Sequence, residues 1–115
     1  MGVIIYHNPK CLKSQEALRF LYDKTSEITI VEYLHRPPGM FELKNILRFL
    51  GCSPRDILRK KESAYRELHL EEDRFTDMEL IKIMAKYPIL IQRPIVVNGE
   101  KAVIGRSLEA IESIL

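Results

Sequence analysis

The chain opens with two short hydrophobic runs that flank one amphipathic segment. The apolar run Val3–Tyr6 ends at His-Asn-Pro and predicts a short buried strand. Apolar residues then recur at helical spacing and predict a helix over Lys13–Lys24. The segment Ile28–Leu34 is rich in β-branched residues and predicts a second strand. Because a strand, a helix and a strand in this order form a right-handed unit with parallel strands, the chain is expected to build an α/β sheet.

The middle of the chain predicts several helices in succession. The turn-forming segment 36–39 ends the second strand, and Gly51 is typical of a helix C-terminus. Thr76 and Glu79 have the spacing of a capping box at the start of another helix. Helices are expected near residues 43–50, 53–61, 62–70 and 76–87. We therefore predict a helical insertion over roughly residues 40–88.

The last part of the chain returns to β structure. Two short apolar runs, Ile95–Val97 and Lys101–Ile104, flank Asn98-Gly99, which predicts a hairpin because both turn positions favour positive φ. A short helix over 108–115 follows. The resulting order is that of a thioredoxin-like fold, an α/β class with a mixed four-stranded sheet and an inserted helical subdomain. Residues 1–115 are expected to form a single domain of common size.

Composition and charge exclude several function classes. A formal net charge of +2 is too small to favour binding to nucleic acid or to a membrane. No apolar run approaches the length of a membrane-spanning helix, and the first run is too short for a signal peptide. We therefore expect a cytoplasmic protein whose two cysteines are thiols. The three histidines are scattered, so no metal site is expected, and without a large exposed apolar stripe we expect a monomer.

Cys11 lies between the end of the first predicted strand and the start of the first helix. A helix N-terminus favours the thiolate, which is the reactive form of cysteine. Lys10 and Lys13 flank the thiol, and Ser14 and His7 are close enough in sequence to form hydrogen bonds with it. The alternative is a small buried hydrophobic residue, but a proline-flanked polar loop is a poor place to bury a cysteine.

The motif reads Cys-Leu-Lys-Ser, so position 14 carries a hydroxyl where a dithiol motif has a second cysteine. Cys11 therefore cannot close a local disulfide, and an external thiol must resolve any adduct that it forms. Cys52 is the other candidate, but its place between two predicted helices favours burial.

Three arginines follow or precede apolar elements: Arg59, Arg93 and Arg106. A single arginine of this kind is ordinarily a solvated surface residue. Three together could converge on one tetrahedral oxyanion, whose geometry suits guanidinium groups. The sequence pattern leaves both interpretations open.

The loop "YHNPKCLKS" resembles the active-site loop of the arsenate reductase (ArsC) family, whose members use glutathione and glutaredoxin. The resemblance continues through "VEYLHRPPG", "LGCSPRDILRKKE" and "YPILIQRPIVVNGEKAVIGRS". It implies a thioredoxin-like fold with an inserted helical subdomain, and a cis peptide bond between Arg93 and Pro94.

The resemblance also implies roles for single residues and a set of partners. It assigns Cys11 as the nucleophile, His7 and Ser14 as thiolate-stabilising residues, and Arg59, Arg93 and Arg106 as oxyanion-binding residues. The implied reaction reduces arsenate to arsenite, with glutathione as reductant and glutaredoxin as the protein partner. No metal or bound organic cofactor is implied.

Two other functions remain open at this point. A glutathione-dependent thiol reductase of the same fold could act on another substrate and would not require all three arginines. A regulator like the related Spx proteins, which contact RNA polymerase, typically carries a Cys-x-x-Cys redox switch, and Ser14 argues against it.

Overall fold

The computed structural model describes residues 2–115 and divides the chain into two compact units. One unit combines the chain up to Arg36 with the segment Arg93–Leu115, and the other comprises Pro37–Gln92. The predicted insertion over 40–88 lies within the second unit. Whether residues 1–115 behave as a single domain stays a prediction. No helix in residues 2–115 is both long enough and apolar enough to span a bilayer.

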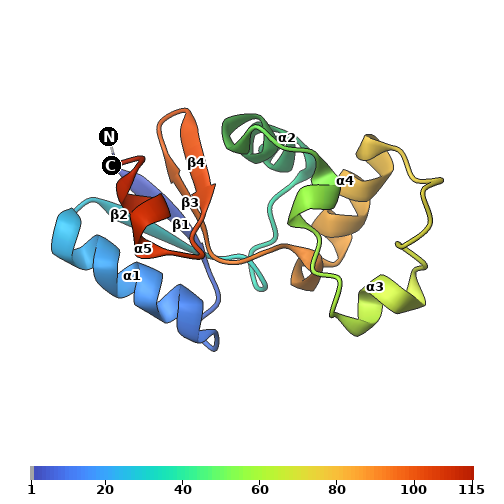
Figure 1. The fold of residues 1–115 in the computed structure, drawn as a ribbon, viewed down its shortest axis with the longest axis horizontal. Helices are drawn as coiled ribbons and strands as arrows, with labels where there is room; N and C mark the ends of the chain where they lie inside the picture. The colour runs from blue at the N-terminus through green and yellow to red at the C-terminus, as the bar shows by residue number, and fades with distance from the viewer. Residues whose placement is uncertain (1) are drawn as a thin grey trace. The chain divides into compact units, whose positions relative to one another are not determined.

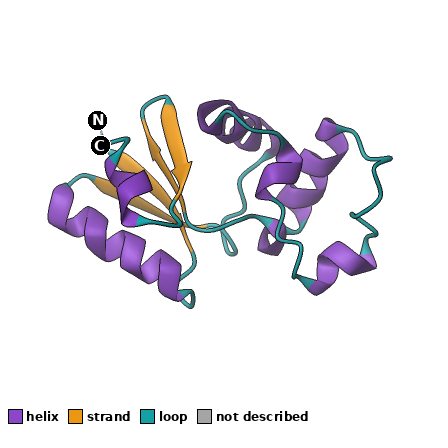
Figure 2. Cartoon of the chain, viewed as in Figure 1, coloured by secondary structure: helices purple, strands orange, loops and turns teal. Residues whose placement is uncertain are grey.

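The first unit is built on a mixed four-stranded sheet with the order β2-β1-β3-β4 (Figure 2). Its strands are β1 (Val3–His7), β2 (Ile28–Glu32), β3 (Ile95–Asn98) and β4 (Lys101–Ile104). The β1 strand pairs parallel with β2 and antiparallel with β3, which pairs antiparallel with β4. The predicted element order and the mixed sheet are therefore confirmed.

These strand directions gather several loops at one edge of the sheet. Because β1, β2 and β4 run in the same direction, their C-terminal ends lie at the edge where β3 begins. That edge, here called the Cys11 edge, carries residues 8–11, residue 33, residues 93–94 and residues 105–106.

Two helices pack on one face of this sheet, α1 (Leu12–Lys24) and α5 (Leu108–Glu112) (Figure 1). Alternate residues of a strand point to the same face, so Val3 and Ile5 of β1 lie beneath these helices. The core between the layers consists of buried aliphatic side chains: Val3, Ile5, Ala17, Leu21, Val96, Ile111 and Ile114. This packing fixes the start of α1, and with it the position of Cys11.

The second unit contains short helices, as predicted. They are α2 (Met40–Leu50), η1 (Pro54–Ile57), α3 (Ser63–Glu67), α4 (Asp77–Lys86) and η2 (Pro88–Leu90). Gly51 ends α2 in the left-handed conformation with φ of 71°. Thr76 and Glu79 form the predicted capping box at the start of α4.

The helix expected over 53–61 is wrong beyond its first turn. Only Pro54–Ile57 is helical, as a 3₁₀ turn with Ser53 as N-cap. Leu58 instead forms an isolated antiparallel bridge with Ile91. The extended pairing takes the backbone groups that a longer helix would have used.

The hairpin forms as predicted, but its turn is shifted by one residue. Asn98 belongs to β3 and pairs with Lys101, so the two turn residues are Gly99 and Glu100. Gly99 has φ of 65°, whereas Asn98 does not have a positive φ. The Asn98 side chain instead donates a hydrogen bond of 2.7 Å to the carbonyl oxygen of Ile114. That contact ties the hairpin to the end of the chain and accounts for the shift.

Gly105 packs tightly against Pro94 at the Cys11 edge. Its N–H donates to the Pro94 carbonyl oxygen at 2.7 Å. A Cβ atom at position 105 would lie 2.9 Å from Pro94 Cγ and 3.3 Å from Ile111 Cδ1. The glycine is therefore required by the close approach of these side chains.

We expect Gly105→Ala to lower the free energy of unfolding by about 1–3 kcal/mol, the usual cost of an overpacked site. Urea denaturation measures the change. Gly39→Ser is the control, because an added Cβ there meets no atom within 4 Å and serine is a favourable N-cap. Equal stability of Gly105→Ala and the parent protein would contradict the packing argument.

Candidate active site

Cys11 occupies the N-cap position of α1, immediately before its first turn. Its backbone is extended, with φ of −101° and ψ of 124°. The Cys11 N–H donates to the Asn8 carbonyl oxygen at 3.0 Å, and its own carbonyl oxygen accepts from Gln15 N–H at 3.0 Å. The thiol therefore lies beside the free N–H groups of the helix start, as the sequence predicted.

Ser14 organises the loop through its hydroxyl group. The side chain is fully buried, and its Oγ accepts a hydrogen bond of 3.0 Å from the Asn8 N–H. The same Oγ lies 2.6 Å from His7 Nδ1. Since Asn8 already donates to Oγ, the Ser14 hydroxyl proton is available to His7. The contact between His7 and Ser14 thus joins the end of β1 to the first turn of α1.

Burial lowers the pKa of His7, while the negative charge of Glu32 acts in the opposite direction. His7 is therefore neutral at neutral pH, and its Nδ1 can accept a hydrogen bond from the Ser14 hydroxyl. A neutral imidazole supports the loop without adding a charge beside the thiol. The predicted contribution of His7 to the thiolate is consequently indirect in this geometry.

The pKa of the Cys11 thiol lies below its ordinary value. Burial alone would raise this pKa, but the backbone N–H groups of Ser14 and Lys13 and the Arg93 guanidinium stabilise the thiolate and outweigh burial. Ser14 thus acts on the sulfur through its backbone, whereas its hydroxyl holds the loop. The Cys11 interpretation as a small core residue is not supported, because the side chain is partly exposed.

Arg93 is the arginine that the structure places beside Cys11. Its Nε and Nη1 atoms are buried, and neither has a hydrogen-bond partner among the described residues. Burial lowers the pKa of Arg93, but the neighbouring Cys11 and Tyr33 groups raise it above its ordinary value. Buried donors without an acceptor are costly. Next to a nucleophile, they are suited to an anionic substrate.

The other two predicted arginines have different settings. Arg106 is exposed in the turn between β4 and α5, on the same sheet edge as Cys11. Arg59 belongs to the second unit, where its Nε donates to Glu62 Oε2 at 3.0 Å and its N–H donates to the Leu90 carbonyl oxygen at 2.8 Å. The convergence of three arginines on one anion therefore stays a prediction.

Cys52 lies in the second unit and has the opposite electrostatic setting. Burial and the negative charge of Asp56 raise the pKa of its thiol. The thiol is mostly protonated at neutral pH and is a poor nucleophile. The Cys52 side chain is partly exposed, like that of Cys11, so the burial expected from the sequence is incomplete and the two thiols differ in their electrostatic setting.

Two residues at the site were not singled out in the sequence. Asn8 is buried, and its Oδ1 accepts a hydrogen bond of 3.0 Å from Lys10 N–H, which closes the loop before Cys11. An asparagine before proline is a recognisable turn signal, so this role could have been found. Tyr33 follows β2, is 1% exposed and lies beside Arg93. No sequence pattern marks it, since its position depends on strand pairing.

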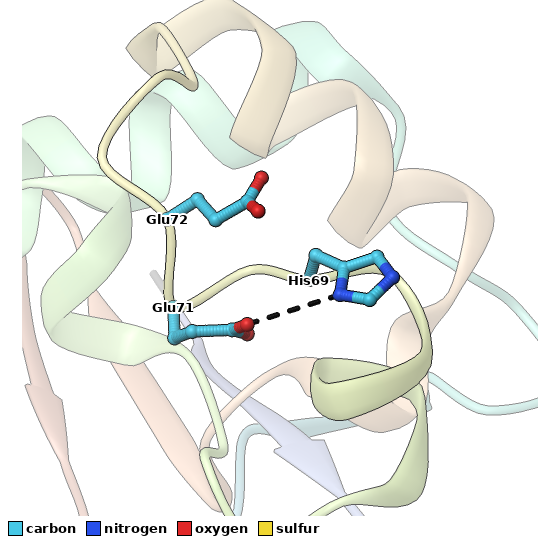
Figure 3. Close-up of side chains that lie close together, drawn as sticks. All are labelled: His69, Glu71 and Glu72. Atoms are coloured by element: carbon cyan, nitrogen blue, oxygen red, sulfur yellow. Dashed lines mark ion pairs between the residues drawn. The ribbon is translucent and has the colours of Figure 1, made fainter.

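One group in residues 2–115 has three potential metal ligands close together: His69, Glu71 and Glu72 (Figure 3). All three side chains are exposed, and His69 Nδ1 is 3.8 Å from Glu71 Oε1. Glu72 already pairs with Arg74, whose Nε lies 2.5 Å from Oε1. We assign the group no role, because all three side chains are exposed and Glu72 is engaged with a cation.

Removing the Ser14 hydroxyl should destabilise the loop. Ser14→Ala leaves the Asn8 N–H and His7 Nδ1 without their shared partner in a buried position. We expect the free energy of unfolding to fall by about 1–3 kcal/mol, as for other buried groups left unsatisfied. Thermal or urea denaturation measures it, and Ser26→Ala, at an exposed position outside the helices and strands, is a control expected to cost less. An unchanged free energy of unfolding in Ser14→Ala would contradict the hydrogen bonds assigned to the Ser14 hydroxyl.

The two thiols should titrate on opposite sides of the pKa of an ordinary cysteine thiol. In Cys52→Ser, the rate of iodoacetamide alkylation plotted against pH should show an inflection below that value, because Cys11 alone reacts. In Cys11→Ser, the inflection should lie above it. Coinciding profiles would contradict the electrostatic description of the loop.

Comparison with known proteins gives consistent results. The ArsC family model matches residues 6–114. An arsenate reductase of Neisseria meningitidis is 41% identical over 96% of this chain and 96% of its own length, and that of Escherichia coli K12 is 42% identical over 99% of this chain and 81% of its own length. The structure of arsenate reductase from Vibrio cholerae superposes with a TM-score of 0.95 at 41% identity, covering 100% of this chain and 98% of its own.

Proposed function

The chain belongs to the ArsC family, and on that premise we propose that it is an arsenate reductase whose nucleophile is Cys11. Its fold is thioredoxin-like, as in the structures that it matches. The observation that carries the proposal is the pairing of a low-pKa thiol with the buried, unpartnered donors of Arg93. The first supplies a nucleophile at neutral pH, and the second supplies a place for an oxyanion.

The first step joins Cys11 to arsenic. The Cys11 thiolate attacks the arsenic of arsenate, an S–As bond forms, and one arsenate oxygen leaves as water after protonation. Arg93 holds the remaining oxygens through its free donors, with Arg59 and Arg106 as the further predicted ligands. No atom changes its oxidation state in this step.

The second step reduces arsenic. A glutathione thiolate attacks Cys11 Sγ, an S–S bond forms, and the S–As bond breaks with its electron pair on arsenic, which leaves as arsenite. The two electrons come from the two sulfurs, which end as a mixed disulfide. Glutaredoxin then attacks the glutathione sulfur and releases the Cys11 thiolate. Glutathione is a consumed reductant, so the proposal includes no bound cofactor and no metal, and such thiol chemistry suits the reducing cytoplasm.

A coupled assay tests this function. Purified protein with arsenate, glutathione, glutaredoxin, glutathione reductase and NADPH should oxidise NADPH and release arsenite in equal amounts. Omission of arsenate should stop both. Glutathione-dependent turnover of a disulfide substrate without any turnover of arsenate would favour the other thiol reductase. Co-purification with RNA polymerase, in the absence of either activity, would favour the Spx-like regulator.

A further inference from the structure

The rim of the Cys11 loop carries two lysines that the reaction described above does not use. Lys10 and Lys13 are exposed on either side of Cys11. The segment from Asn8 to Gln15 contains no acidic residue. The exposed surface of the loop on both sides of Cys11 is therefore cationic.

The other charged groups around the loop do not cancel this charge. Arg93 adds a third cation directly beside the thiol. Glu16 lies one turn into α1, and Glu32 ends β2, where its charge acts on His7. Lys10 and Lys13 have no ion-pair partner among the described residues. Their charge is consequently available to an incoming molecule.

The chain itself offers no suitable thiol to resolve an adduct on Cys11. Position 14 is serine, and its hydroxyl is committed to the loop. Burial and the negative charge of Asp56 raise the pKa of the Cys52 thiol, which makes it a poor nucleophile. The resolving thiol therefore comes from solution and meets the cationic rim first.

We propose that Lys10 and Lys13 select a carboxylate-bearing small thiol as the molecule that attacks the Cys11 adduct. The inference rests on the proposed function and names the residues that recognise its reductant. The attacking species is a thiolate, so every thiol gains from the two cations, and one with additional carboxylates gains more. Exposed ion pairs contribute little to binding, so the selection acts on the rate of encounter and attack.

A disulfide exchange measures this selection without arsenate. Cys11 is first joined to thionitrobenzoate in the Cys52→Ser background. An added thiolate attacks Cys11 Sγ, a new S–S bond forms, and the old S–S bond breaks with its electron pair on the coloured thionitrobenzoate. Second-order rate constants are compared for glutathione, which has two carboxylates, and cysteamine, which has none and carries an ammonium group.

The variant Lys10→Glu/Lys13→Glu should lower the ratio of the glutathione rate to the cysteamine rate by about tenfold at low salt. The ratio cancels any effect on Cys11 itself, because both thiols attack the same sulfur. The control Lys24→Glu/Lys101→Glu makes the same charge change at the opposite ends of α1 and β4, where the ratio should stay unchanged. Added salt at about 0.5 M should shrink the preference of the parent protein for glutathione.

An unchanged ratio in Lys10→Glu/Lys13→Glu, or an equal drop in the control, would overturn the proposal. Leu12, which is 73% exposed between the two lysines, gives a second control. Leu12→Gln changes the same surface without charge and should leave the ratio as it is. Because the exchange involves no arsenic, loss of the ratio effect refutes the selection and leaves the proposed function standing, whereas failure of the arsenate assay refutes the proposed function and leaves the exchange result unaffected.

Discussion

Replacing Cys11 with serine should reduce arsenate turnover by a factor on the order of 10³ or more, as expected when a covalent nucleophile is lost. The serine hydroxyl has nearly the size of the thiol, so the N-cap geometry of α1 is retained. It is a far weaker nucleophile at neutral pH, even with the same backbone N–H groups around it. The coupled assay measures the loss, and circular dichroism confirms that the variant is folded.

The matched variant is Cys52→Ser, which should retain turnover within about twofold, because its thiol has a raised pKa and takes no part in the proposed steps. If both variants are folded and lose arsenate turnover to a comparable extent, the Cys11 adduct is resolved by an internal disulfide with Cys52 and not by an external thiol. A Cys11→Ser protein with full activity would remove the covalent mechanism altogether.

Replacing Arg93 with alanine should lower kcat/KM for arsenate by about 100-fold, the scale seen when one positioned donor to a developing anion is removed. The change removes the buried Nε and Nη1 donors and the charge that stabilises the Cys11 thiolate. It should therefore also raise the pKa obtained from the Cys11 alkylation profile. A purely structural role for Arg93 would not move that profile in the folded protein.

Arg93→Lys is the informative intermediate. It keeps the charge but loses the planar fork, so it should retain most of the low Cys11 pKa and recover only part of the arsenate activity. Full arsenate activity in Arg93→Ala would contradict the assignment of this arginine to the oxyanion. That result would mean that groups other than Arg93 hold the arsenate oxygens.

Much of the fold follows from local sequence signals. The opening strand, helix and strand, the helical middle and the closing hairpin were all predicted, because apolar periodicity and turn residues agree with the tertiary structure there. The errors arose where long-range contacts determine the local backbone conformation. Residues 58–61 leave the helical state because Leu58 pairs with Ile91, and the hairpin shifts because Asn98 bonds to Ile114.

The candidate site likewise combines features that the local sequence predicts with features that depend on long-range contacts. Cys11 and its helix N-terminus could be read from the sequence, since both are local features. The separate roles of the Ser14 hydroxyl and the Ser14 backbone could not be predicted from the sequence, because they depend on where His7 and Asn8 lie in the folded loop. Arg93 was one of three arginines that the sequence placed beside apolar elements, and nothing local set it apart from the other two, since its burial beside Tyr33 is a product of strand pairing.

The central claim is that Cys11 forms the adduct and that a thiol from solution resolves it. Mass spectrometry of the intact protein and its peptides, after reaction with arsenate and glutathione without glutaredoxin, tests this most directly. We predict one glutathione attached to the peptide that contains Cys11, formed only when arsenate is present, with Cys52 unmodified. A disulfide between Cys11 and Cys52, or glutathione attached equally with and without arsenate, would contradict it.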